Sequence, residues 1–191
     1  MYINPDFSTL ILAGGKATRM NGNDKGLVIW QDAPLISHVL KNLPKDDVVI
    51  SCNRNLAIYS QYGRVVSDKS PDFAGPLAGI AAALPECHHD WVLITACDMP
   101  CLPPNIAELL WCNIADNKIA VAHDGEHLQP LLLLIHRSLA QNILQSVNNG
   151  NSSVYKWLMQ HPHHVVYFTD TTVFTNVNSL DALLPQTATK V

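Results

Sequence analysis

Short apolar runs alternate with amphipathic segments along most of this chain. The runs Thr9–Ala13, Val48–Cys52 and Trp91–Ala96 are short and apolar, which is typical of strands buried on both faces of a sheet. Apolar residues recur at helical spacing in Pro34–Leu43, and its proline suits the first position of a helix. The same criteria predict further strands at 64–67, 119–122, 131–136 and 165–168, and helices at 55–62, 76–84, 104–115, 137–147, 154–160 and 180–184.

This alternation of strands and helices predicts the fold class. Repeated β-α units favour a mostly parallel sheet with right-handed crossovers and helices on both faces, which is a Rossmann-like, doubly wound α/β fold. The 191 residues are most simply one domain. Hydrophobic residues make up 48% and charged residues 15%, so the composition is that of a compact globular protein.

Polar or glycine residues follow four of the predicted strands. Gly14 follows the first, Asn53 the second, Asp68 the third and Asp98 the fourth along the chain. Sheets of this class bind ligands outside the carboxyl ends of their strands. Because four independent segments place such residues there, the sequence predicts a nucleotide site at this edge.

The loop after the first strand combines flexible backbone with positive charge. Gly14-Gly15 is followed by Lys16, Arg19 and Lys25. Glycine lets the backbone wrap closely around phosphate oxygens, and the cations supply charge against them. The loop matches neither the Walker A motif nor the dinucleotide fingerprint. A strand-turn-helix with solvated basic residues is the alternative, but the cation spacing favours phosphate binding.

Three of the strand-end side chains have two interpretations each. Asp98 is suited to hold Mg²⁺ shared with a triphosphate, or to act as a turn residue before Pro100. Asp68 has the same placement, but its Asp-Lys-Ser-Pro context is also an ordinary turn. Asn53 could bond the base or sugar of a nucleotide, or cap the following helix.

Charge and hydropathy exclude several classes of protein. The net charge of −4, with 12 Lys and Arg, argues against a nucleic-acid surface. No apolar stretch approaches the roughly 20 residues of a membrane span, and the N-terminus lacks the basic region of a signal peptide, so a cytoplasmic protein is expected. The five cysteines are irregularly spaced and lack a paired C-x-x-C, which favours mostly buried, reduced thiols over a zinc or disulfide role.

Residues 12–26 read Leu-Ala-Gly-Gly-x-x-x-Arg-Met-x-x-x-Asp-Lys-Gly, which resembles the signature of the molybdenum cofactor guanylyltransferase family of nucleotidyltransferases. Further family-like motifs follow in the same order along nearly the whole chain. They are Val-Ile-Ser-Cys-Asn-Arg at 49–54, Gly-Pro-Leu-Ala-Gly at 75–79, Cys-Asp-Met-Pro at 97–100, His-Asp-Gly-Glu at 123–126 and Phe-Thr-Asn-Val-Asn at 174–178.

The resemblance implies a nucleotide-diphospho-sugar transferase-like fold and a specific reaction. GMP would be transferred from GTP to the terminal phosphate of molybdenum-molybdopterin, with release of pyrophosphate and with Mg²⁺ as cofactor. The N-terminal half, about residues 7–100, would bind the nucleotide, and the C-terminal half, about 101–191, the molybdopterin. Transient contact with cofactor-insertion proteins or recipient molybdoenzymes would follow from the lability of the product.

The resemblance also assigns roles to individual residues. It implies catalysis by Arg19, Lys25 and Asp98, with Mg²⁺ on Asp98. The residues implied to contact GTP are Leu12, Ala13, Gly14, Gly15, Lys25, Asn53, Asp68 and Asp98. Those associated with the pterin are Gln129, Pro130, Asn176 and Asn178, although the Asn-Val-Asn segment is also a plausible turn.

The chain departs from the family pattern at two places. Asn21 stands where many members have glycine, and Asn151-Ser152-Ser153 replaces a segment that is often basic. Two other functions stay open at this point. A cytidylyltransferase acting on molybdopterin or on a sugar or polyol phosphate would share the glycine loop and the strand-end aspartate. A non-catalytic nucleotide-binding module would not need the full set of phosphate and metal groups.

Overall fold

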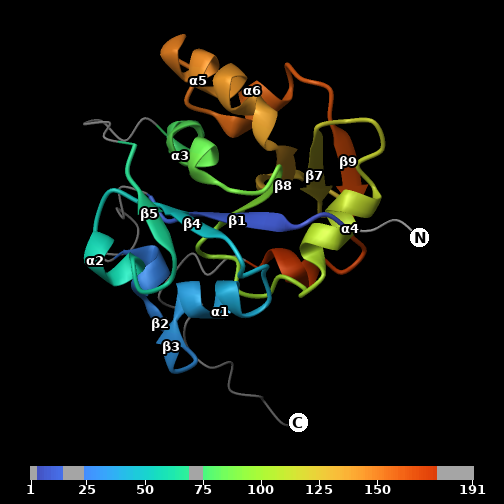
Figure 1. The fold of residues 1–191 in the computed structure, drawn as a ribbon. Helices are drawn as coiled ribbons and strands as arrows, with labels where there is room; N and C mark the ends of the chain where they lie inside the picture. Colours follow the sequence, from blue (N-terminus) through green and yellow to red (C-terminus); the bar gives the residue numbers. More distant parts are fainter. Residues whose placement is uncertain (1–3, 15–23, 69–74, 176–191) are drawn as a thin grey trace, which may run out of the picture.

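A central seven-stranded sheet organises the computed structural model, which describes residues 4–14, 24–68 and 75–175 (Figure 1). The strand order across the sheet is β5-β4-β1-β6-β8-β7-β9. These strands are β1 (Phe7–Leu12), β4 (Val48–Ser51), β5 (Arg64–Val66), β6 (Trp91–Ala96), β7 (Ile119–His123), β8 (Leu128–His136) and β9 (His164–Tyr167). The α-helices are α1 (Leu35–Lys41), α2 (Leu56–Tyr59), α3 (Pro76–Ala83), α4 (Ile106–Cys112), α5 (Ala140–Asn148) and α6 (Val154–Leu158).

Strand β8 is the one strand of the described sheet that runs against its neighbours. It pairs antiparallel with both β6 and β7, whereas β1 pairs parallel with β4 and β6, and β9 pairs parallel with β7. Only residues 124–127 separate β7 from β8. A connection this short makes a hairpin and cannot make the crossover that parallel strands require. The expectation of a mostly parallel sheet is confirmed.

Two hydrophobic layers cover the sheet, one on each face. Helices α3, α5 and α6 lie on one face, where Leu77, Ile143 and Trp157 are buried (Figure 1). Helices α1 and α4 lie on the other face, where Ile36 and Ile106 are buried. Alternate residues of each strand enter the two layers, which explains why the strands read as continuous apolar runs.

The predicted strands, and the predicted helices within the described residues, are present with small shifts at their ends. The 137–147 helix begins as the 3-10 helix η4 (Arg137–Leu139). The 3-10 helices η2 (Lys25–Leu27), η3 (Leu84–Glu86) and η5 (Thr171–Phe174), together with a hairpin of β2 (Ile29–Trp30) and β3 (Ala33–Pro34), were not predicted. The helical turn predicted at 180–184 lies outside the described residues.

The cysteines follow the expectation of mostly buried thiols. Cys52, Cys87 and Cys97 are buried, while Cys101 and Cys112 are exposed. Burial raises the pKa of the Cys52 thiol and of the Cys87 thiol to about 12. These thiols are therefore protonated at neutral pH. Within residues 4–14, 24–68 and 75–175, no helix has the length and apolar character of a membrane span.

A buried carboxylate ties together the amino-terminal ends of four strands. Asp47, just before β4, accepts hydrogen bonds from Ser8 Oγ on β1 (2.5 Å) and from the backbone N–H of His88 ahead of β6 (2.7 Å). Arg64 at the start of β5 donates from Nη2 at 2.5 Å. Burial alone would raise the pKa of Asp47, but these hydrogen bonds and the Arg64 charge outweigh it and lower the pKa.

We predict that Asp47→Asn lowers the free energy of unfolding by about 1–3 kcal/mol, because it removes a charged acceptor from buried donors. Since the folded-state pKa is lowered, Asp47 stabilises the protein above its unfolded-state pKa of about 4. This contribution is lost as the pH falls through the folded-state value. Urea unfolding between pH 7 and pH 3 should therefore show a shallower pH dependence in Asp47→Asn than in wild type.

The neighbouring Asp46 is exposed and offers a matched control. Asp46→Asn should keep both the stability and the pH dependence of wild type. Equal stability of the Asp46→Asn and Asp47→Asn proteins across this pH range would contradict the role given to Asp47.

Candidate functional site

The carboxyl ends of β4, β1 and β6 lie side by side at one edge of the sheet. The strand pairing continues to the end of β1, because Ala13 N–H donates to Ser51 O (2.9 Å) and Cys97 N–H donates to Leu12 O (3.1 Å). The side chains of Leu12 and Ala13 are buried in the core, whereas Gly14 is exposed. Leu12 and Ala13 can therefore offer only their backbone to a ligand at this edge.

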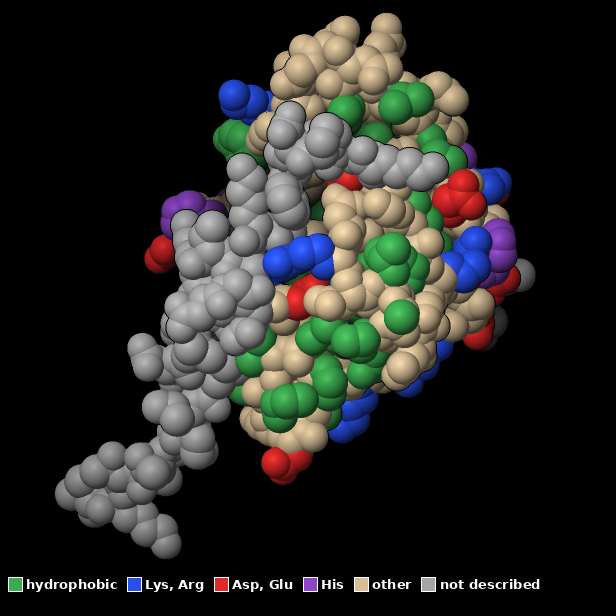
Figure 2. Space-filling view, turned by 90° about the vertical axis from the view of Figure 1, so that its left-hand side faces the viewer, with side chains coloured by type: hydrophobic (Ala, Val, Ile, Leu, Met, Phe, Trp, Pro, Cys, Tyr) green, Lys and Arg blue, Asp and Glu red, His purple; other side chains and the backbone are tan. Residues whose placement is uncertain are grey.

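Lys25 and Asp98 form an ion pair at this edge. Lys25 begins η2, and Asp98 follows β6 by two residues; Lys25 Nζ donates to Asp98 Oδ2. Both side chains are largely shielded from solvent. Figure 2 shows the molecule from this side, with a Lys or Arg side chain lying directly against an Asp or Glu side chain near the middle of the face. The structure thus brings together two of the three predicted catalytic residues, which lie 73 positions apart.

Asn53 and Asp68 form a second polar cluster, at the ends of β4 and β5. Asn53 Nδ2 donates to Asp68 Oδ1 at 2.6 Å. Asn53 Oδ1 accepts from Ser67 Oγ at 2.7 Å and from the backbone N–H of Asp68 at 3.2 Å. Asn53 does not cap the next helix, whose N-cap position is Asn55. Of the two interpretations, the capping role of Asn53 is therefore wrong.

Gln129 and Pro130 lie on β8, the strand that pairs with β6. Gln129 Nε2 donates to Asp124 Oδ2 at 2.7 Å. Asp124 also accepts from the backbone N–H groups of His127 and Glu126, and these bonds lower the pKa of its carboxyl. The Gln129 side chain is thus held by the β7–β8 turn, and Gln129 is in register with Ala122 of β7.

Some predicted site residues cannot be placed. Gly15, Arg19, Asn176 and Asn178 lie outside the described residues.

A hydrogen-bond cluster beside the Lys25–Asp98 pair was not predicted from the sequence. Asp24 Oδ1 accepts from Tyr59 Oη at 2.5 Å, and Asp24 Oδ2 accepts from Asn55 Nδ2 at 2.9 Å. Asn55 and Tyr59 are separated by one helical turn, which by itself is typical of an ordinary helix face. Their contact with Asp24 spans more than 30 residues, so only the tertiary structure shows it.

Cys97 lies buried between this cluster and the ion pair. Burial, together with the charge of Asp98, raises its pKa far above the ordinary value for a thiol. The Cys97 thiol is therefore neutral and packs as an apolar side chain. Within residues 4–14, 24–68 and 75–175, no group of three His, Cys, Asp or Glu side chains is arranged to hold a metal ion.

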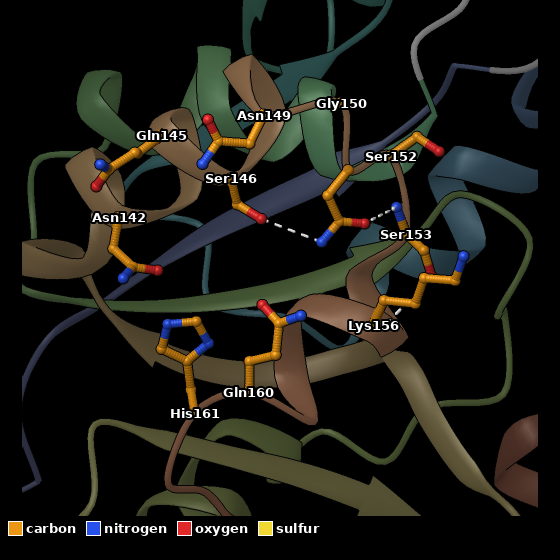
Figure 3. A pocket seen from close by; sticks show the side chains of 11 residues that line it. Asn142, Gln145, Ser146, Asn149, Gly150, Ser152, Ser153, Lys156, Gln160 and His161 are labelled. Atoms are coloured by element: carbon orange, nitrogen blue, oxygen red, sulfur yellow. Dashed lines mark hydrogen bonds between the residues drawn. The ribbon is translucent and has the colours of Figure 1, made fainter.

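A polar hollow of about 670 Å³ lies between α5 and α6, on the helix face that also contains α3 (Figure 3). It includes the Asn151-Ser152-Ser153 segment. Asn151 Nδ2 donates to Ser146 Oγ (3.0 Å), the Ser153 hydroxyl caps α6, and Ser152 O accepts from Leu77 N–H (3.4 Å) at the start of α3. These three residues therefore join α5, α6 and α3, and Lys156 is the one Lys or Arg in the described lining.

Glycine permits this close contact between α3 and the segment. A Cβ atom on Gly75, which has φ +84°, would lie 2.6 Å from Ser152 O. The Gly-Pro-Leu-Ala-Gly motif thus serves helix packing in this structure. Its second glycine likewise faces Ser51 on β4, where a Cβ would lie 2.6 Å from the hydroxyl oxygen.

Comparison with known proteins identifies relatives of the chain over most of its length. Residues 9–165 match the family model of the MobA-like NTP transferase domain. The molybdenum cofactor guanylyltransferase of Photobacterium profundum is 40% identical over 92% of this chain and 93% of its own length. The protein of the same name from Cupriavidus pinatubonensis is 37% identical over 96% of this chain and 97% of its own.

Solved structures show the same fold. Molybdopterin-guanine dinucleotide biosynthesis protein A from Archaeoglobus fulgidus superposes with a TM-score of 0.72 at 24% identity, covering 92% of this chain and 94% of its own. A nucleotidyl transferase from Methanothermobacter thermautotroptrophicus gives a TM-score of 0.73 at 15% identity, covering 92% and 93%. The sequence match over most of the chain identifies it as a member of the MobA-like NTP transferase family, together with the molybdenum cofactor guanylyltransferases.

Proposed function

We propose that this protein transfers GMP from GTP to the terminal phosphate of molybdenum-molybdopterin, forming the guanine dinucleotide cofactor and pyrophosphate. The observation that carries the proposal is the Lys25–Asp98 pair at the carboxyl edge of the sheet, in a chain whose relatives bear the guanylyltransferase name. Ligands of open α/β sheets bind at this edge. GTP and molybdenum-molybdopterin are the proposed substrates, and the cytoplasm is the proposed location.

The nucleotide is proposed to bind over β1, β4 and β5. Gly14, with Gly15 beside it in the sequence, would offer backbone N–H groups, while Leu12 and Ala13 would contribute backbone alone. Asn53 and Asp68 provide amide and carboxylate groups suited to a base or a ribose. Their mutual hydrogen bond orients both side chains at the ends of neighbouring strands.

The residues present fit a magnesium ion shared with a triphosphate. Mg²⁺ binds through one or two carboxylates plus phosphate oxygens, so one strand-end aspartate is enough. Asp98 is such a carboxylate, and it already has a cation against it, the Lys25 ammonium. Asp98 is therefore the proposed metal ligand. Bound Mg²⁺ would supply positive charge to the phosphate oxygens.

The protein's own residues would align the reactants and offset their charge. The acceptor phosphate monoester is mostly ionised near pH 7, so its attack on the α-phosphorus needs no strong general base. Lys25 and Arg19 would then stabilise the charge that develops on the phosphates as pyrophosphate leaves. The bond formed joins the acceptor oxygen to the α-phosphorus, and the bond broken joins that phosphorus to the oxygen bridging it to the β-phosphate.

The acceptor is proposed to bind toward β8, in the C-terminal half. Gln129 and Pro130 lie on the strand next to β6, and Asn176 and Asn178 would complete the site. Amide groups can match the alternating donors and acceptors of a pterin edge. Transfer of the product to insertion proteins or recipient enzymes by transient contact is part of the proposal, because the cofactor is labile.

We predict that Asp98→Ala lowers Mg²⁺-dependent turnover by about 10²–10³-fold, as expected when a preorganised charge partner is removed from a reacting phosphate. Pyrophosphate release measures the turnover. Asp90→Ala is the control, because Asp90 is an exposed aspartate at the opposite end of β6. Wild-type turnover in a folded Asp98→Ala protein would remove Asp98 from the mechanism.

We predict that Lys25→Ala lowers kcat/KM for GTP, since it removes a positive charge from the triphosphate. The fall should correspond to a loss of about 2–4 kcal/mol of transition-state stabilisation. Steady-state kinetics with varied GTP measure the change. Lys118→Ala, at an exposed lysine just before β7, should leave the kinetics unchanged. If Lys25→Ala and Lys118→Ala gave the same GTP kinetics as wild type, Lys25 would not act on the phosphates.

A further inference from the structure

Both oxygens of the Asp24 carboxylate are held from the second α-helix of the chain. Tyr59 Oη donates to Oδ1 at 2.5 Å, and Asn55 Nδ2 donates to Oδ2 at 2.9 Å. Tyr59 is the last residue of α2, and Asn55 is its N-cap. Asp24 immediately precedes Lys25 in the chain. The two hydrogen bonds therefore restrain the residue next to the proposed phosphate-binding lysine.

The residue after Lys25 is also confined. A Cβ atom on Gly26 would lie 2.5 Å from Tyr59 Oη and 3.2 Å from Cys97 Cβ, so only glycine fits between them without displacement. Cys97 in turn precedes Asp98. Lys25 thus lies between Asp24, which is hydrogen-bonded to Tyr59, and Gly26, which packs closely against Tyr59 and Cys97.

The Asn55 side chain serves the contact with Asp24 and not the helix, although its backbone carbonyl accepts from Ile58 N–H (2.9 Å) and Tyr59 N–H (3.0 Å) at the start of α2. An N-cap asparagine usually accepts a hydrogen bond from the first turn with its side chain, but Asn55 makes no such bond. Its backbone has φ +53°, in the left-handed region, and its side-chain amide reaches Asp24. Asparagine adopts positive φ more readily than most non-glycine residues, and this conformation allows the side-chain amide to reach Asp24 while the carbonyl begins the helix.

We infer that Tyr59 and Asn55 are positioning residues, which hold Asp24 and thereby fix the Lys25 ammonium for the triphosphate. The inference rests on the proposed function, since it deepens the role given to Lys25. Neither residue is a catalytic residue, because neither would touch the substrate. Tyr59 is completely buried. Its burial, with nearby negative charge, raises its pKa well above the ordinary value, so its hydroxyl keeps the proton that it donates to Asp24.

Tyr59→Phe tests this inference by removing one hydroxyl from a buried ring. We predict an about ten-fold rise in KM for GTP and in the Kd of GTP measured by calorimetry, which is the effect of losing one strong hydrogen bond to a charged group. The KM for molybdenum-molybdopterin should stay unchanged. A merely structural role would lower kcat and the melting temperature and leave both GTP constants at the wild-type value.

Tyr62→Phe and Asn55→Gly complete the experiment. Tyr62 is a partly buried tyrosine just after α2 whose hydroxyl has no hydrogen bond to Asp24, so its variant should match wild type. Asn55→Gly removes the side-chain amide at an exposed position and tolerates the positive φ, so it tests the same contact if Tyr59→Phe fails to fold. It should also raise the KM and Kd for GTP.

Double variants distinguish a role in positioning Lys25 from a general structural role. In a Lys25→Ala background, Tyr59→Phe or Asn55→Gly should cause no further change in the Kd of GTP, because the group being positioned is gone. Additive losses would overturn the inference, as would wild-type GTP constants in both single variants of an active enzyme. A wild-type protein that transfers no nucleotide would instead overturn the proposed function on which the inference rests.

Discussion

Parallel pairing of β1 with both β4 and β6 is the constraint on which the site depends. Leu12 is in register with Ser51 on one side and with Ala96 on the other, so three strands end at the same level. The loops that follow β1, β4 and β6 must therefore start close to one another. Gly14, Asn53 and Asp98 meet at one edge for this reason, although nothing in their local sequence connects them.

The carboxylates at the two edges of the sheet have different tasks. At the amino edge, Asp47 is surrounded by donors from neighbouring segments and serves stability. At the carboxyl edge, Asp98 has the ammonium of Lys25 as its partner, a contact that a metal-bound triphosphate would replace in the proposed mechanism. Asp24, the neighbour of Lys25 in the chain, accepts hydrogen bonds from Asn55 and Tyr59, so the proposed exchangeable ion pair lies beside a hydrogen-bonded cluster.

Much of the fold could be predicted from the sequence, because its signals are local. The apolar run Trp91–Ala96 is preceded by Asp90, is followed by Cys97-Asp98, and is the observed β6. The β2–β3 hairpin was not predicted, since Gln31 and Asp32 adopt positive φ values at its turn without the usual glycine. The contact of Tyr59 with Asp24 could not be predicted from the sequence either, because a hydrogen bond between residues 35 positions apart does not affect the local pattern of apolar residues. The strand-end rule indicated Asp98, but the choice of guanine came only from the family resemblance.

The most direct test of the account is calorimetric binding of GTP, CTP and ATP to the purified protein, with and without Mg²⁺. A nucleotidyltransferase that makes the guanine dinucleotide should bind GTP with a lower Kd than either CTP or ATP, and Mg²⁺ should lower the Kd for GTP further. A lower Kd for CTP would contradict the account. It would keep the fold and the phosphate site and assign the chain a cytidylyl transfer instead.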